Sequence, residues 1–175
     1  KMSLNFGTIA HDDSLAEIFD LGSIVAGGAV TGDNANIFRD IRICFETKLQ
    51  QLSFTNIIFE NQALDLESLD KGADGIEWIR GTLLPAQTEA GSFGATGQDI
   101  HKGIFQVDYY CEAGKGGFTE KLDTIANAFK RSTKLSFNNL DVHCTSVSLG
   151  AGQREDAFFG RNVDVSYFAV TAARS

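Results

Sequence analysis

The chain has 175 residues, the size of one domain, and its 43% hydrophobic content is ordinary for a globular protein with a buried core. Its net charge is −8 and no block of lysine or arginine exceeds two residues, which argues against nucleic-acid binding because that needs clustered cations. No stretch approaches the ~18 apolar residues of a membrane span, and the three cysteines are too widely spaced for a disulfide framework or a zinc cage.

The first 33 residues differ from the rest of the chain. Short apolar runs alternate there with glycine pairs, and no period is sustained. We expect residues 1–33 to form an N-terminal arm or extension, with a short helix around residues 14–19 and a strand around residues 24–30. Residues 34–175 are expected to form the α+β domain.

A helical pattern follows from Asn34. Its apolar residues are four apart: Ile37, Ile41, Phe45 and Leu49. The residues between them are mostly charged, so the spacing predicts an amphipathic helix, with Asp33 or Asn34 as its cap.

Three strands are predicted next. The β-branched and aromatic run at residues 56–61 suits the first, and residues 76–85 suit the second, which ends at the only proline, Pro85. Residues 86–99 hold three glycines and little apolar content, so we expect a long mobile connection. Apolar and polar side chains then alternate from Phe105 to Cys111, which is the period of a half-buried strand.

The last part of the chain predicts a helix and two or three strands. Apolar residues repeat at helical spacing from Phe118 to Phe129. A short strand ending in an Asn138-Asn139 turn follows, then two longer strands at residues 140–150 and 157–170, joined by polar residues 151–156. The expected fold is α+β, a mostly antiparallel sheet with both helices packed on one face.

The turn "AGKGG" before the second helix is reminiscent of a phosphate-binding loop. GxxxxGK[ST] fails here, because Tyr109 stands where the first glycine is needed and Gly116 where Ser or Thr is needed. GxGxxG fails as well. The turn is therefore interpreted as a strand-to-helix connection that uses glycine for positive φ, with a weak anion site as the alternative.

No motif for catalysis or metal binding is present. His11, His101 and His143 lack metal-type spacing, nucleophile signatures such as GxSxG are absent, and the adjacent acids lie in polar turns. We therefore expect no catalytic residue, no metal and no cofactor, and the cysteines are interpreted as small buried core residues.

Phenylalanine is frequent, at 14 residues. One sheet layer with two helices leaves a sheet face open, and this favours burial of aromatic side chains between copies. The candidates are Trp78, Phe93, Phe158, Phe159 and Phe168. Burial of all of them in a single core is the alternative.

The segment "IEWIRGTLLPAQTEAGSFGATGQDIHKGIFQVDYYCEAGKGG" resembles the tail-terminator-like (tail completion) proteins of tailed bacteriophages. That family typically has W-[IVL]-R-x-T-L-L-P-A, G-I-[FY]-Q-V-D-V and A-G-K-G. The matching positions here are Trp78, Arg80, Leu83, Pro85, Gly103, Gln106, Val107, Asp108, Gly114 and Gly116. The resemblance extends over roughly residues 34–170, and the N-terminal extension departs from it.

The resemblance implies a structural, non-enzymatic virion protein. Such a protein assembles in the host cytoplasm as a hexameric ring on the head-proximal end of the tail tube, stops tube polymerisation and joins the tail to the neck. Its partners would be other copies, the tail tube protein and a neck or head-completion protein, with DNA passing through the lumen without specific binding and no membrane involved.

The pliable connection and the motif that carries the resemblance give candidate residues for an interface with the tail tube or another subunit. They are Gln87, Thr88, Glu89, Phe93, Gln98, Asp99, Trp78 and Arg80. Two other functions stay open at this point: another neck, stopper or adaptor protein of the phage, and a small-molecule-binding domain or enzyme that uses Lys115.

Overall fold

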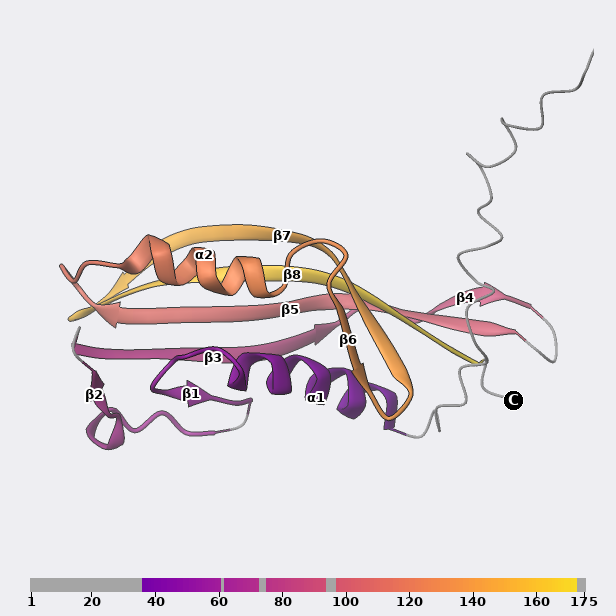
Figure 1. Cartoon of the computed structure of the whole chain (residues 1–175), viewed down its shortest axis with the longest axis horizontal. Helices are drawn as coiled ribbons and strands as arrows, with labels where there is room; N and C mark the ends of the chain where they lie inside the picture. The colour runs from indigo at the N-terminus through magenta and orange to yellow at the C-terminus, as the bar shows by residue number, and fades with distance from the viewer. Residues whose placement is uncertain (1–35, 61, 73–74, 94–96, 173–175) are drawn as a thin grey trace, which may run out of the picture.

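The computed structural model describes residues 36–60, 62–72, 75–93 and 97–172. The predicted N-terminal extension at residues 1–33, with its short helix and strand, lies outside these ranges, as does His11. Two α-helices and eight strands are arranged as Figure 1 shows. Their bounds are α1 (Ile37–Gln50), β1 (Ile57–Ile58), β2 (Lys71–Gly72), β3 (Gly75–Pro85), β4 (Glu89–Ser92), β5 (Gln98–Glu112), α2 (Phe118–Ala128), β6 (Lys134–Phe137), β7 (Leu140–Glu155) and β8 (Phe158–Ala172).

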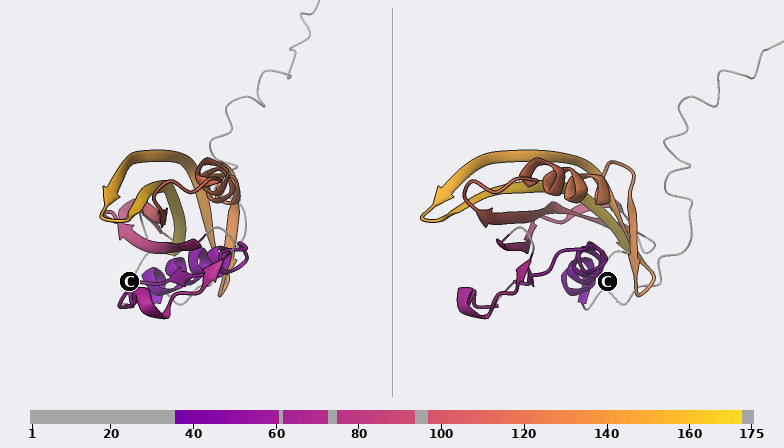
Figure 2. Two further views of the ribbon diagram at one scale, coloured as in Figure 1. Left: turned by 90° about the vertical axis from the view of Figure 1, so that its left-hand side faces the viewer. Right: turned by 60° about the vertical axis from the view of Figure 1, so that its left-hand side comes forward.

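The strands form one curled sheet in the order β1-β3-β5-β8-β7-β6, with β2 added to β3 and β4 added to β5 (Figure 2). β1 runs parallel to β3, and every other pairing within the described ranges is antiparallel. The β5–β8 ladder runs from Gln98 opposite Ala172 to Glu112 opposite Phe158. The predicted α+β class with a mostly antiparallel sheet is therefore confirmed.

Both helices pack on one face of the sheet, as predicted. The apolar stripe of α1 is buried, and Phe45 stacks on Phe105 of β5 with ring centroids 4.4 Å apart. Leu122 and Ile125 of α2 join the same core. Asn36, rather than Asp33 or Asn34, precedes the first helical residue of α1, and its side chain makes no capping hydrogen bond.

Two short turns match their predictions. Asn138 and Asn139 connect β6 to β7 with φ values of 50° and 60°, the left-handed conformation that asparagine tolerates in a two-residue hairpin. Gly114 and Gly117 have φ values of 86° and 79° in the "AGKGG" turn, and no atom lies where a Cβ at either would stand. Backbone conformation therefore accounts for these two glycines.

The first predicted strand is mostly wrong, since β1 keeps only residues 57–58 of the expected 56–61, and Asn61 lies outside the described ranges. The side chain of Asn56 instead bridges two other segments, donating to the carbonyls of Asp70 and Glu77 and accepting from the Asp70 amide. The Phe59 amide donates to the Gln62 side chain, which turns the chain away from the sheet.

Two predicted connections are also corrected. Polar residues 151–156 were expected to be a loop, but β7 continues through Glu155 and only a tight turn at Asp156 remains. Its polar side chains are compatible with a strand because this end of β7 is exposed. Residues 86–99 were expected to be a mobile connection, but β4 and the start of β5 pair there as a hairpin. Backbone pairing needs no apolar side chains, so composition could not reveal it.

Candidate functional site

The candidate interface residues divide into two groups. Gln87, Thr88, Glu89, Phe93, Gln98 and Asp99 all belong to one hairpin, called here the arm, which consists of residues 86–102 and projects beyond α1 at one end of the sheet (Figure 1). Trp78 and Arg80 lie on β3, in the body of the sheet. The structure therefore brings six of the eight together and separates the other two.

The base of the arm is held by a buried histidine. His101 of β5 is 3% exposed, and its ring nitrogens lie 3.0 Å from Thr88 Oγ1 and 2.9 Å from Thr171 Oγ1 of β8. Phe38 of α1 packs edge-on against the same ring at a centroid distance of 5.9 Å. The His101 ring therefore connects the arm to α1 and to β8, and it fixes the position of the base of the arm.

The tip of the arm is the most exposed apolar feature of the described chain. Phe93 is 94% exposed, directly after β4. Nearer the base, Glu89 forms an ion pair with Lys102 across the hairpin, while Asp99 has no ion pair in the described ranges. Apolar side chains that are exposed singly are common on protein surfaces, so the exposure of Phe93 makes it available for a contact without defining one.

A groove of about 310 Å³ lies beside the arm, between the first half of α1 and the end of β3. Its lining residues are Phe38, Arg39, Arg42, Glu60, Leu83 and Pro85. Phe38 is 40% exposed there, and the Nε of Arg42 is buried without a hydrogen-bond partner. The groove thus combines apolar side chains with two arginines. Each arginine already has a carboxylate partner, since Arg39 Nη2 lies 3.0 Å from Asp40 Oδ1 and Arg42 Nε lies 3.5 Å from Glu46 Oε1.

Sequence reasoning did not identify this groove. One signal was present: Phe38 is an apolar residue adjacent to the α1 stripe that begins at Ile37, in a position where an amphipathic helix is normally polar. The other lining residues come from three separate segments, and only the tertiary structure shows that they meet.

Trp78 belongs to an aromatic cluster on the opposite face of the sheet. Its ring is stacked on Tyr110 at a centroid distance of 4.9 Å, and Phe158 packs edge-on at 4.8 Å. Trp78 is only 4% exposed, so in this chain it stabilises the sheet. A Cβ at Gly160 would lie 2.3 Å from the Tyr110 ring, so only glycine fits beneath it.

Arg80 lies beside four polar side chains on the same face of the sheet. They are called here the polar square, and they are Gln106, Asp108, Asn162 and Asp164. Gln106 donates to Asp108 at 2.7 Å on β5, and Asn162 donates to Asp164 at 2.7 Å on β8. Burial raises the pKa of Asp108; the bond from Gln106 and the charge of Arg80 oppose this rise, whereas the charge of Asp164 adds to it. The square holds two carboxylates near one guanidinium, and it contains no nucleophile.

A buried charged cluster joins α2 to the sheet. Glu77 is 8% exposed; it accepts from Tyr109 Oη at 2.9 Å and from Lys121 Nζ at 3.0 Å. Burial first, and then the hydrogen bond to Glu77, raise the pKa of Tyr109. Each group already has a partner inside the protein, so this cluster serves packing.

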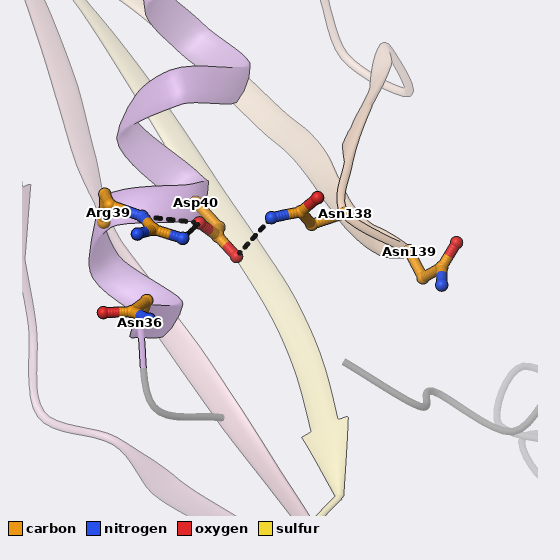
Figure 3. A pocket seen from close by; sticks show the side chains of 5 residues that line it. All are labelled: Asn36, Arg39, Asp40, Asn138 and Asn139. Atoms are coloured by element: carbon orange, nitrogen blue, oxygen red, sulfur yellow. Dashed lines mark hydrogen bonds and ion pairs between the residues drawn. The ribbon is translucent and has the colours of Figure 1, made fainter. Parts of the chain in front are cut away.

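A small pocket of about 200 Å³ lies between the start of α1 and the β6–β7 turn (Figure 3). Asp40 points between Arg39 and Asn138; its Oδ1 accepts from Arg39 Nε at 3.0 Å and its Oδ2 accepts from Asn138 Nδ2 at 3.4 Å. Both carboxylate oxygens of Asp40 therefore have hydrogen-bond donors within the protein, and these bonds connect the start of α1 to the β6–β7 turn.

The described residues contain no group of three or more potential metal ligands. All three cysteines are free and buried, and burial raises the pKa of Cys44 to about 12 and that of Cys144 to about 11. These thiols are protonated at neutral pH and are poor nucleophiles. Within the same ranges, no helix has the length and apolar character needed to cross a membrane.

Comparison with known proteins gives a family and a fold. The profile of a family described as phage tail terminator protein matches residues 40–167. One solved structure superposes with a TM-score of 0.55 at 20% identity, covering 77% of this chain and 96% of the other, which shows a shared fold. No curated protein matches significantly.

The family match begins at Asp40, within α1, and includes the whole arm, α2 and most of β8. It therefore covers the arm and most of the core, but it starts after Phe38 and Arg39 of the groove. The chain belongs to the phage tail terminator family and is a structural protein of the phage tail.

Proposed function

We propose that this chain forms a ring, most simply a hexamer, on the head-proximal end of the tail tube. There it stops tube polymerisation and presents a surface to the neck. The observation that carries the proposal is the family match over residues 40–167. The partners are other copies, the tail tube protein and a neck or head-completion protein, and the site of assembly is the host cytoplasm.

An unpaired sheet edge supports assembly between copies. β6 pairs with β7 only from Leu140 to His143, so the outer edge of β7 from Thr145 to Arg154 has no strand partner within the described ranges. Such an edge offers free backbone donors and acceptors to another chain. The arm offers a second contact, and we assign its exposed residues Gln87, Glu89 and Phe93 to an interface with a neighbour or the tube.

The net charge of −8 is consistent with a lumen through which DNA slides. Repulsion between acidic side chains and phosphates keeps the passing duplex from sticking. We assign no catalytic residue and no cofactor to this function. Residues 1–33 would then contact a neighbouring subunit or another part of the virion.

Shortening the arm tests the role in tail length. Replacing residues 90–99 with Asn-Gly joins Glu89 to Ile100 through a two-residue turn and keeps the Thr88–His101–Thr171 bonds. In a phage whose own copy is deleted, the wild-type chain should restore tails of uniform length, and the shortened variant should yield overlong or headless tails. Normal tails from the shortened variant would contradict the role of the arm.

Location separates the terminator from a neck or stopper protein. A labelled copy imaged on the particle should lie where tube meets neck, in contact with the last tube ring. A label confined to the head side of the neck would favour a stopper, and electron microscopy of the purified protein would give the ring order.

A further inference from the structure

Two consecutive cations lie at the end of α2 in an otherwise acidic chain. Lys130 and Arg131 are the only adjacent basic residues of the sequence, whose net charge is −8. Both are exposed, and within the described ranges neither forms an ion pair. Lys134 follows in the same segment and is paired with Asp141 at 2.8 Å. Residues 130–134, called here the basic turn, therefore carry two positive charges that are free to meet carboxylates from another molecule.

The basic turn is fixed beside an unpaired strand edge. The Thr133 amide donates to the Lys130 carbonyl at 3.0 Å, and the Cys144 amide of β7 donates to the Thr133 carbonyl at 2.9 Å. Beyond Cys144, the outer edge of β7 has no strand partner within the described ranges. Leu149 lies further along this edge and is 43% exposed, and its partner Val163 is in the core that α2 covers, so Leu149 is on the same side of the sheet as α2.

The loop between β1 and β2 carries the opposite charge. Residues 62–70, called here the acidic loop, contain Asp65, Glu67 and Asp70 and no lysine or arginine. Within the described ranges, none of these three carboxylates forms an ion pair. The negative charge of the acidic loop is therefore as unneutralised as the positive charge of the basic turn.

The acidic loop also presents apolar surface on a fixed backbone. Leu64 and Leu66 are 36% and 42% exposed. The Asp65 carboxylate accepts from the Glu67 amide at the start of a short 3-10 helix (Leu66–Ser68). At the end of the loop, Asn56 holds the backbone of Asp70 at both its amide and its carbonyl. Docking of this loop therefore costs less conformational entropy than docking of an unanchored segment.

The two surfaces lie at opposite ends of the strand order. The acidic loop leads into β2 on the outer side of β3, whereas the basic turn leads into β6 at the far end of the sheet. Figures 1 and 2 show α2 above the sheet and the segment before β2 below it. Because neither surface neutralises the other within one described chain, a second copy is the partner that supplies the complement of each.

We propose that the acidic loop of one copy docks on the basic turn and the adjoining edge of β7 in the next copy. The loop carboxylates then face Lys130 and Arg131, while Leu64 and Leu66 cover Leu149. Complementary charge selects the partner and its register, and burial of the leucines adds affinity. The inference rests on the proposed ring and names its subunit contact. Because the two surfaces differ, the contact is head-to-tail, and its repetition closes a ring when the rotation permits.

Charge reversal is the first test, with assembly of the full-length protein followed by light scattering and electron microscopy. The variants Lys130→Glu/Arg131→Glu and Glu67→Lys/Asp70→Lys should each raise the concentration for half-assembly by roughly tenfold or more, because like charges then face each other. Lys48→Glu, at a cation of α1 outside both surfaces, should leave it unchanged. The reversed side chains are exposed, so circular dichroism and thermal melting should match wild type, which separates lost assembly from lost fold.

Mixing the two charge-reversed variants tests the head-to-tail geometry. Each variant alone places like charges in every contact, but the mixture allows one wild-type contact and one with both charges exchanged. The expected product is a ring in which the two variants alternate, with equal numbers of each by native mass spectrometry. A mixture that stays unassembled, or either variant assembling alone at wild-type concentrations, would overturn the proposal.

Cross-linking tests the contact directly. With a short bismaleimide, the double variant Leu66→Cys/Leu149→Cys should give a ladder of covalent oligomers that ends at the ring number. The control Leu66→Cys/Lys48→Cys should give none, and the native cysteines are buried and stay silent. A mixture of the single variants Leu66→Cys and Leu149→Cys should stop at a covalent dimer.

The outcomes distinguish this contact from the proposed function. Wild-type protein that forms no ring, either alone or on tail tubes, would remove both. Wild-type rings that give no cross-linked ladder and persist after both charge reversals would overturn only the contact between the acidic loop and the basic turn.

Discussion

The two halves of β5 belong to different regions of the molecule. From Phe105 to Cys111, alternate side chains are buried beneath α1 and α2, and Phe45 stacks on Phe105. From Gln98 to Lys102, the same strand forms one side of the arm, where only His101 is buried. One continuous strand therefore serves both the core and a projecting contact element.

Gly103 marks the change between the two regions. A Cβ there would lie 2.6 Å from both the Leu84 carbonyl and the Tyr167 hydroxyl, so no other residue fits without displacement. The core half is expected to determine the free energy of unfolding. The arm half is expected to determine assembly, because its side chains bury little area in the single chain.

The largest effect is expected in the core. Phe45→Ala removes a fully buried ring that contacts Phe105, Phe129 and Tyr167, and it should lower the free energy of unfolding by about 3–5 kcal/mol. Denaturant unfolding measures this loss. The control Phe38→Ala, at the half-exposed ring on the same helix, should cost about 1 kcal/mol or less; equal costs would contradict the division into regions.

The second-largest loss in the free energy of unfolding is expected in the buried charged cluster of Glu77, Tyr109 and Lys121. Glu77→Ala leaves Lys121 and the Tyr109 hydroxyl without their shared acceptor, and the free energy of unfolding should fall by about 1–3 kcal/mol. Glu120→Ala, at an exposed acid on α2, should change it by less than about 0.5 kcal/mol. A negligible effect at Glu77 would mean that the cluster contributes nothing to holding α2.

The dependence of the free energy of unfolding on pH should reveal the contribution of Asp108 in the polar square. Because the pKa of Asp108 is raised in the folded chain, the folded state binds its proton more tightly than the unfolded state does. The contribution of Asp108 therefore favours folding below its ordinary pKa of 3.8, and declines as pH rises through the elevated pKa.

Asp108→Asn keeps the acceptor for Gln106 and removes the charge, so it should raise the free energy of unfolding at pH 7 by roughly 0.5 kcal/mol. The difference between variant and wild type should vanish below pH 3.8, as measured by unfolding at several pH values. Asp141 provides the opposite control: hydrogen bonds from Lys134 and Ser136 lower its pKa, so its contribution is present above the ordinary value and is lost in acid.

The smallest effect on folding is expected at the tip of the arm. Phe93→Ala should change the free energy of unfolding by less than about 0.5 kcal/mol, because its ring is almost entirely in solvent. Calorimetry of the dilute protein measures this. A clear destabilisation would show that the arm belongs to the folding core.

Local periodicity was enough to predict α1, α2 and the core half of β5, and local residue types were enough to predict β3 and the Asn138-Asn139 turn. The helices and the half-buried strand can be predicted from adjacent residues, because an element that buries one face must repeat apolar side chains at its own period. The α+β class followed from the order of these elements. Family resemblance, rather than spacing, led to the tail terminator prediction that the profile match confirmed.

Tertiary structure decided the arm and the groove. Within residues 86–99, β4 forms backbone hydrogen bonds with the start of β5. The polar side chains of this segment do not indicate that pairing. The groove joins α1, Glu60 and β3, while the anchor at the base of the arm joins Thr88, His101 and Thr171 across two strands. Such contacts depend on sheet register and helix placement, which are set by the packing of the whole chain and not by any one segment.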